Sequence, residues 1–301
     1  MKKRFKAIAT LTLALSLLLM IATGCSTKPA SQSSADSATN APKKVLLAVS
    51  FGTSYNDNRD LSIGGIEKAL QAAYTDYEVR RAFTSQIIID KLKERDKLEI
   101  DNVKEAMNRL VADGVKDVVI QPTHVMNGYE YDDIVAEVTP YKDKFDSFKI
   151  GKNLLSSDAD YQEVTKIITE DTKAYNVDGT AIVFMGHGTE APSNATYAKM
   201  QKTLTDAGHN RYFVGTVEAT PSLEDVMALV KASGATKVVL EPLMIVAGDH
   251  ANNDMAGDED GSWKTEFEKE GFQVETVIKG LGQMPGIQNL IVKHAGETMA
   301  E

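Results

Sequence analysis

The chain has 301 residues, which is enough for one large α/β domain or for two domains of ordinary size. Its 43% hydrophobic and 25% charged residues are ordinary for a folded protein, so they exclude wholesale disorder and a membrane protein with several spans. The formal net charge of −10 would repel phosphate backbones, so no nucleic acid is expected among the partners.

The N-terminal segment has the pattern of an export signal that ends at the single cysteine. Basic residues fill most of 2–6, an apolar run too short to span a membrane with its flanks covers 11–23, and Gly24-Cys25 follow. Small residues before a cysteine resemble the bacterial lipoprotein processing box, so we expect a signal peptide at 1–24 and a lipid anchor at Cys25. A plain secretory signal is the alternative. The predicted location is the cell envelope, periplasmic or on the outer surface.

The next segment, 25–42, is rich in Ser and Ala and has almost no large apolar residues. This composition predicts a flexible tether. Because the cysteine belongs to the signal, the folded part has none. It can form neither a disulfide nor a CxxC zinc site, and a metal there must be held by His, Asp or Glu.

From Lys43 onward, short apolar runs alternate with amphipathic stretches, which is the pattern of a doubly wound parallel α/β sheet. Buried strands are predicted at 45–49, 118–120, 181–185, 212–217 and 238–240. Helices are predicted from apolar spacing or from start signals at 63–77, 100–111, 164–168, 222–230 and from Pro285 onward.

Two pairs of segments repeat in the same order. Residues 45–54 resemble 181–190, each with a Gly-Thr pair after the strand, and 114–133 line up with 234–253. Two ordered matches predict two similar α/β domains, 43–178 and 179–301, with a ligand cleft between them.

The two halves differ where the strands end. Phe51 aligns with His187, and Glu130 aligns with His250. Open α/β sheets bind ligands at the carboxyl ends of their strands, so the second half carries histidines where a ligand is expected to bind.

His187, Glu218 and His250 are all predicted at strand ends of the second half. Two imidazoles and one carboxylate suit a divalent first-row metal better than Mg or Ca. Each residue alone would fit a turn-stabilising role equally well. If the metal is delivered onward, the two histidines are candidates both to bind it and to accept protons.

The other histidines are weaker candidates. His124 follows the first-half strand, with Tyr129 and Glu130 in its loop, and it either faces the cleft or stabilises a turn. His209 lies in a polar turn and is expected at the surface, while His294 lies in the last helix and is expected to pack or be exposed. Dinucleotide, P-loop and GxSxG motifs are absent from the sequence, which excludes those classes.

Several blocks in order resemble one known family across nearly all of residues 43–299. They are LAVSFGTS at 47–54, RRAFTSQIIIDKL at 80–92, QPTHVMNGYEYDD at 121–133, MGHGTEAPSNATY at 185–197, GTVEATPS at 215–222 and PLMIVAGDHANNDMAGD at 242–258. The chain resembles the anaerobic sirohydrochlorin cobaltochelatases of cobalamin biosynthesis, CbiK-type class II chelatases that are akin to ferrochelatases. The resemblance implies two α/β domains with a tetrapyrrole in the cleft.

By motif, the resemblance places the cobalt ligands of the family on His187, Glu218 and His250. It implies ATP-independent insertion of Co(II), with Fe or Ni as other candidates, into sirohydrochlorin. We expect His124, Tyr129 and Glu130 to contact the tetrapyrrole, and we leave the oligomeric state, a homo-oligomer included, open.

The export signal departs from the family, because cobalamin synthesis is cytoplasmic. An exported haem-, tetrapyrrole- or metal-binding carrier with vestigial chelatase activity is therefore the second hypothesis. A substrate-binding lipoprotein of an ABC transporter is the third, and the three-ligand set argues against it.

Overall fold

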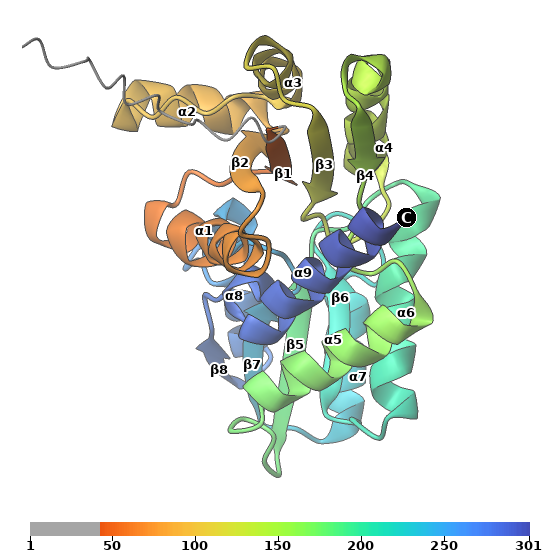
Figure 1. Ribbon diagram of the computed structural model, residues 1–301. Coiled ribbons are helices and arrows are strands. Elements are labelled where there is room, and N and C mark those ends of the chain that lie inside the picture. Colours follow the sequence, from red (N-terminus) through yellow and green to blue (C-terminus); the bar gives the residue numbers. More distant parts are fainter. Residues whose placement is uncertain (1–42) are drawn as a thin grey trace, which may run out of the picture. The chain divides into compact units, whose positions relative to one another are not determined.

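Two four-stranded parallel sheets form the framework of the protein in a computed structural model that describes residues 43–301 (Figure 1). The predicted signal peptide and tether lie outside the described residues. The first sheet has the order β2-β1-β3-β4 and the second β6-β5-β7-β8. The strands are β1 (Lys44–Ser50), β2 (Glu78–Phe83), β3 (Asp117–Pro122), β4 (Ser147–Ile150), β5 (Thr180–Gly186), β6 (Tyr212–Thr216), β7 (Lys237–Pro242) and β8 (Gln273–Thr276).

The same order of strands in both sheets makes the two halves equivalent: β5 corresponds to β1, and β7 to β3. In each half the chain leaves the first strand toward one edge and later returns to pair on its other side, as in Val45↔Val118 and Ala181↔Val238. The predicted fold class, two similar doubly wound parallel α/β units, is confirmed.

Helices cover both faces of each sheet (Figure 1). They are α1 (Asn56–Ala73), α2 (Gln86–Asp96), α3 (Val103–Ala112), α4 (Tyr129–Val138), α5 (Asp158–Asp171), α6 (Ala195–Asp206), α7 (Leu223–Ser233), α8 (Trp263–Lys269) and α9 (Pro285–Ala300). Short 3-10 turns lie at η1 (Thr139–Lys144), η2 (Pro192–Asn194) and η4 (Leu281–Gln283), and a π turn lies at η3 (Ala251–Met255). No helix among residues 43–301 is long and apolar enough to cross a membrane.

The central strands are apolar throughout because both of their faces are buried. Alternate residues of β1, such as Leu47, pack with α3 and α4, and the corresponding face of β5 packs with α7 and α8. The other faces, which carry Leu46 and Ile182, share one core with residues of α1, α5, α6 and α9.

The last helix, α9, packs against α1, α5, β3 and β4, so the end of the chain returns to the first sheet. The described residues belong to a single compact unit. The domain boundary between 178 and 179 stays a prediction.

Some predicted bounds were wrong. Helix α1 ends at Ala73, so Tyr77 lies beyond it, and α3 begins after a capping box on Asn102, which leaves Ile100 outside. The capping box at Ser222 and the start of the last helix at Pro285 are confirmed.

His294 packs rather than facing solvent, and it joins α9 to the start of α5. Its Nε2 lies 3.0 Å from Oδ1 of Asp160, and both residues are buried. The other oxygen of Asp160 accepts hydrogen bonds from the backbone and hydroxyl groups of Ser156 and Ser157. Burial raises the pKa of Asp160, but these bonds together lower it below the ordinary 3.8.

Asp160→Ala should lower the free energy of unfolding at pH 7 by about 3 kcal/mol, because His294 and two amides lose a buried acceptor. The folded pKa is below the unfolded one, so this stabilisation is complete above pH ~3.8 and is lost as the pH falls through the folded pKa. Urea unfolding from pH 7 to pH 3 measures both effects. Asp158→Ala, which removes an exposed carboxylate from the same helix turn, should cost under about 1 kcal/mol. Equal losses in the two variants would contradict the assignment.

Candidate metal and tetrapyrrole site

One pocket of about 570 Å³ lies where the loops after β1, β3, β5 and β7 meet. In each sheet the order in which strands are added reverses between two neighbouring parallel strands, β1 and β3 in the first sheet and β5 and β7 in the second. Such switch points are where open α/β sheets bind ligands. The volume is in the usual range for small-molecule sites.

The Gly-Thr pairs of the sequence repeat form the turns that follow β1 and β5. Gly52 and Gly188 have φ of +101° and +90°, in the region that favours glycine. A Cβ at Gly52 would lie 2.7 Å from the Phe83 ring, and one at Gly188 would lie 2.8 Å from the amide of Ala219. These turns therefore direct the preceding residues, Phe51 and His187, into the pocket, where both line the wall.

The structure brings the three predicted metal ligands together. One donor atom from each of His187, Glu218 and His250 lies within 4.8 Å of the other two. The two imidazole rings meet edge to face, with centroids 4.6 Å apart, and Glu218 Oε2 lies 3.6 Å from His187 Nδ1. The side chains are 46%, 53% and 32% exposed in chain order, so the group is reachable from the pocket. Its role as a metal site stays a prediction.

The neighbours of the two histidines fix which nitrogen can bind a metal. His187 Nδ1 lies 2.9 Å from the carbonyl of Gly188, and His250 Nδ1 lies 2.8 Å from Oδ2 of Asp254. Both partners are acceptors, so both Nδ1 atoms carry the proton and both Nε2 atoms keep a free lone pair. A metal at this cluster would therefore be held by two Nε2 atoms and one carboxylate oxygen.

Backbone bonds hold Glu218 beside His187. The amide of Glu218 donates to the His187 carbonyl at 2.9 Å, and the amide of Val217 donates to the Gly186 carbonyl at 3.0 Å. The loop after β6 is thereby fastened to the loop after β5, which explains why residues 31 positions apart meet.

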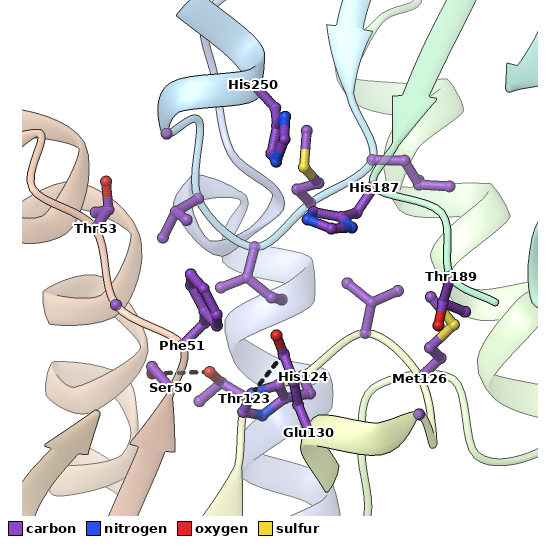
Figure 2. A pocket seen from close by; sticks show the side chains of 18 of the residues that line it. Ser50, Phe51, Thr53, Thr123, His124, Met126, Glu130, His187, Thr189 and His250 are labelled. Atoms are coloured by element: carbon purple, nitrogen blue, oxygen red, sulfur yellow. Dashed lines mark hydrogen bonds and ion pairs between the residues drawn. The ribbon is translucent and has the colours of Figure 1, made fainter. Parts of the chain in front are cut away.

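The first half supplies the facing wall. Figure 2 shows His124 and Glu130 on one side of the pocket, with His187 and His250 on the other. His124 is buried, its Nε2 lies 3.3 Å from Glu130 Oε2, and Tyr129 stands 60% exposed at the rim. All three predicted tetrapyrrole contacts line the pocket.

Sequence reasoning missed Tyr197 and Asp254. The Tyr197 hydroxyl accepts the amide hydrogen of Gly188 at 3.1 Å and so holds the turn that carries His187. Burial raises the pKa of Tyr197, which keeps the hydroxyl protonated. Both residues lie inside the quoted sequence blocks, and Asp254 lies four positions after His250, one helical turn away.

The charge of the lining is one-sided. The described residues that line the pocket include no Lys or Arg. They include four acidic residues, Glu130, Glu190, Glu218 and Asp249. A cleft with one sign of charge concentrates the opposite ion, so a metal cation is drawn to it. Apolar groups such as Val125, Met126, Leu243 and Ile245 complete the walls.

Facing α/β halves with a His-Glu-His cluster above an apolar cleft define a protein of the chelatase class. The chain belongs to the family described as Cobalt chelatase (CbiK), whose model matches residues 44–300.

Two curated relatives support this assignment. The chain is 39% identical over 257 residues to the sirohydrochlorin cobaltochelatase of Salmonella typhimurium, covering 85% of this chain and 97% of that one. It is 28% identical over 254 residues to the sirohydrochlorin cobaltochelatase CbiKC of Nitratidesulfovibrio vulgaris, covering 84% and 89%. Among solved structures, SirB from Bacillus subtilis with Fe3+ shares the fold, with a TM-score of 0.60 at 14% identity over 86% of this chain and 96% of SirB.

Asp254→Asn should weaken Co(II) binding by about 10- to 100-fold, because an amide no longer fixes the His250 tautomer or strengthens its Nε2 as a donor. Calorimetric titration with Co(II) measures the affinity. Asp260→Asn removes the same charge from an exposed side chain of the following loop and should leave the affinity unchanged. Similar losses in both variants would mean that net charge, not the contact with His250, sets the affinity.

Proposed function

We propose that this protein inserts Co(II) into sirohydrochlorin without ATP, in the pocket between its two halves. Family membership and the two curated cobaltochelatases support the reaction. The observation that assigns metal binding to particular residues is the cluster of His187, Glu218 and His250 on the pocket wall, whose donor atoms lie within 4.8 Å of one another.

The metal ion is a substrate, and its binding has a simple physical basis. The Nε2 atoms of His187 and His250 and an oxygen of Glu218 replace water around the ion, and the carboxylate offsets part of its charge. Because the side chains are partly exposed, the ion can arrive from solvent and leave toward the pocket.

Insertion exchanges two pyrrole N–H protons for one divalent ion. Two positive charges leave and two enter, so the net charge of the macrocycle does not change. The apolar walls suit the flat face of a tetrapyrrole. With no Lys or Arg in the described lining, the peripheral carboxylates of the substrate are expected to face solvent or neutral donors such as Thr53 and Tyr55.

The donor set does not select cobalt by affinity alone. Two imidazoles and a carboxylate also suit Fe and Ni, and the Irving–Williams order places Ni above Co. We propose that insertion of Fe or Ni is chemically open to this site and that metal supply decides the product.

His187→Ala should reduce the rate of cobalt insertion by at least about 100-fold, because the ion loses one of its three ligands. Optical titration of sirohydrochlorin with Co(II) follows the product spectrum. His209→Ala, at a partly buried histidine outside the pocket, should retain wild-type rates. Tight binding of preformed haem without any turnover would instead favour a carrier.

We also propose that the protein is an exported lipoprotein anchored through Cys25, with a tether over 25–42. The basic start, the short apolar run and Gly24-Cys25 support this proposal.

Cys25→Ser in the full-length chain should move the protein from the membrane fraction to the soluble fraction of expressing cells, since the thiol is the site of lipid attachment. Immunoblotting of the fractions, with incorporation of labelled fatty acid, measures the change. The lipid anchor would be contradicted if the wild-type protein took up no fatty acid and Cys25→Ser remained in the membrane fraction.

A further inference from the structure

His124 is a buried histidine with unused hydrogen-bonding capacity. His124 is 9% exposed, and neither of its ring nitrogens makes a hydrogen bond within the described part of the chain. An imidazole carries at least one N–H donor and, when neutral, one acceptor, and leaving them without partners opposes folding. Such a group is better explained by a ligand that completes its bonding than by packing.

The backbone around His124 is fixed, so the ring has a defined place. Thr123 bonds to Ser50 through their hydroxyls at 2.8 Å, and its amide donates to the Val49 carbonyl at 2.9 Å. The carbonyl of His124 itself accepts the amide hydrogen of Leu154 at 2.8 Å. The end of β3 is therefore tied to β1 on one side and to the segment before α5 on the other.

The ring has one charged neighbour that connects it to solvent. Nε2 lies 3.3 Å from Oε2 of Glu130, and the Glu130 side chain is 50% exposed. A buried imidazole beside a half-exposed carboxylate is a short route for a proton from the pocket to water.

The two metal-binding histidines are poorly placed to accept the first protons. Their Nδ1 atoms are donors to Gly188 and Asp254, and their Nε2 lone pairs are the ones that hold the ion. Until the ion has left, neither ring has a free lone pair, yet the pyrrole protons must leave as the ion enters. Their role as first proton acceptors, expected from the sequence, therefore needs a second group.

We propose that His124 accepts the pyrrole protons from the face of the macrocycle opposite the metal ligands and passes them through Glu130 to water. Each transfer breaks one pyrrole N–H bond and forms one N–H bond on His124, the electron pair stays on the pyrrole nitrogen, and Glu130 then takes the proton to solvent. Two such transfers balance the entry of one Co(II). Figure 2 shows the required placement, with His124 and Glu130 across the pocket from His187 and His250. The inference rests on the proposed function.

The test compares wild type with His124→Gln, using sirohydrochlorin and Co(II) as substrates. We expect kcat to fall by about 100-fold. The affinity for Co(II) alone and the KM for either substrate should change by less than about threefold, because no metal ligand is altered. In His124→Ala, added imidazole should restore part of kcat. His209→Gln, the same change outside the pocket, should match wild type.

Three results would overturn the proposal. They are a kcat for His124→Gln within about twofold of wild type, a loss of Co(II) affinity as large as the loss of kcat, or no rescue of His124→Ala by imidazole. If the His124 variants do not fold, Glu130→Gln tests the proposal instead, because the Glu130 side chain is half-exposed. An unchanged kcat for Glu130→Gln would reject the proposal. An inactive wild-type protein would reject the proposed function itself, whereas active wild type with fully active variants rejects only the role of His124.

Discussion

The site depends on the packing of both sheets against one shared helical core. Leu46 of β1 and Ile182 of β5 belong to the same buried cluster, together with residues of α1, α5, α6 and α9. Because α9 returns from the second sheet to the first, the carboxyl ends of β1, β3, β5 and β7 are held around one pocket. Without this core, His187, Glu218 and His250 could not face His124 across the pocket.

The two halves have the same strand order but carry different side chains where their strands end. An aromatic ring, Phe51, directly follows β1, whereas the proposed metal ligand His187 directly follows β5. In the proposed reaction the second half would hold the ion, and the first half would offer the imidazole of His124 as a proton acceptor. The proposed exchange of protons for a metal would use both kinds of group, one on each side of the flat tetrapyrrole.

The sequence predicted the central strands and most residues of the candidate site, because these parts have strong local signals. Apolar runs identify β1, β5 and β7, and strand-end positions identify His187, Glu218 and His250. The edge strands β4 and β8 were not predicted, because SFKI and QVET are four residues long and only partly buried. Strand β2, with two arginines in EVRRAF, was missed for the same lack of an apolar run. Tyr197 and Asp254 act through contacts made only in the folded chain, so no spacing rule alone assigns their roles.

The two halves also differ in the core, where Glu241 of β7 occupies the position of Gln121 of β3. The Gln121 amide nitrogen donates to the carbonyls of Pro122 and Lys152. Its Oε1, like both oxygens of Glu241, lacks a partner among the described residues. Burial, with the nearby Asp171, raises the pKa of Glu241 to about 8. This carboxyl is therefore mostly neutral near pH 7, and its folded pKa exceeds the unfolded value of about 4.5. The folded state then binds more protons between those two values, so this group opposes stability increasingly as the pH rises through that window. The second half thus carries a buried ionisable group within β7, the strand whose following loop presents His250, whereas the first half carries a neutral amide within β3, the strand that precedes His124.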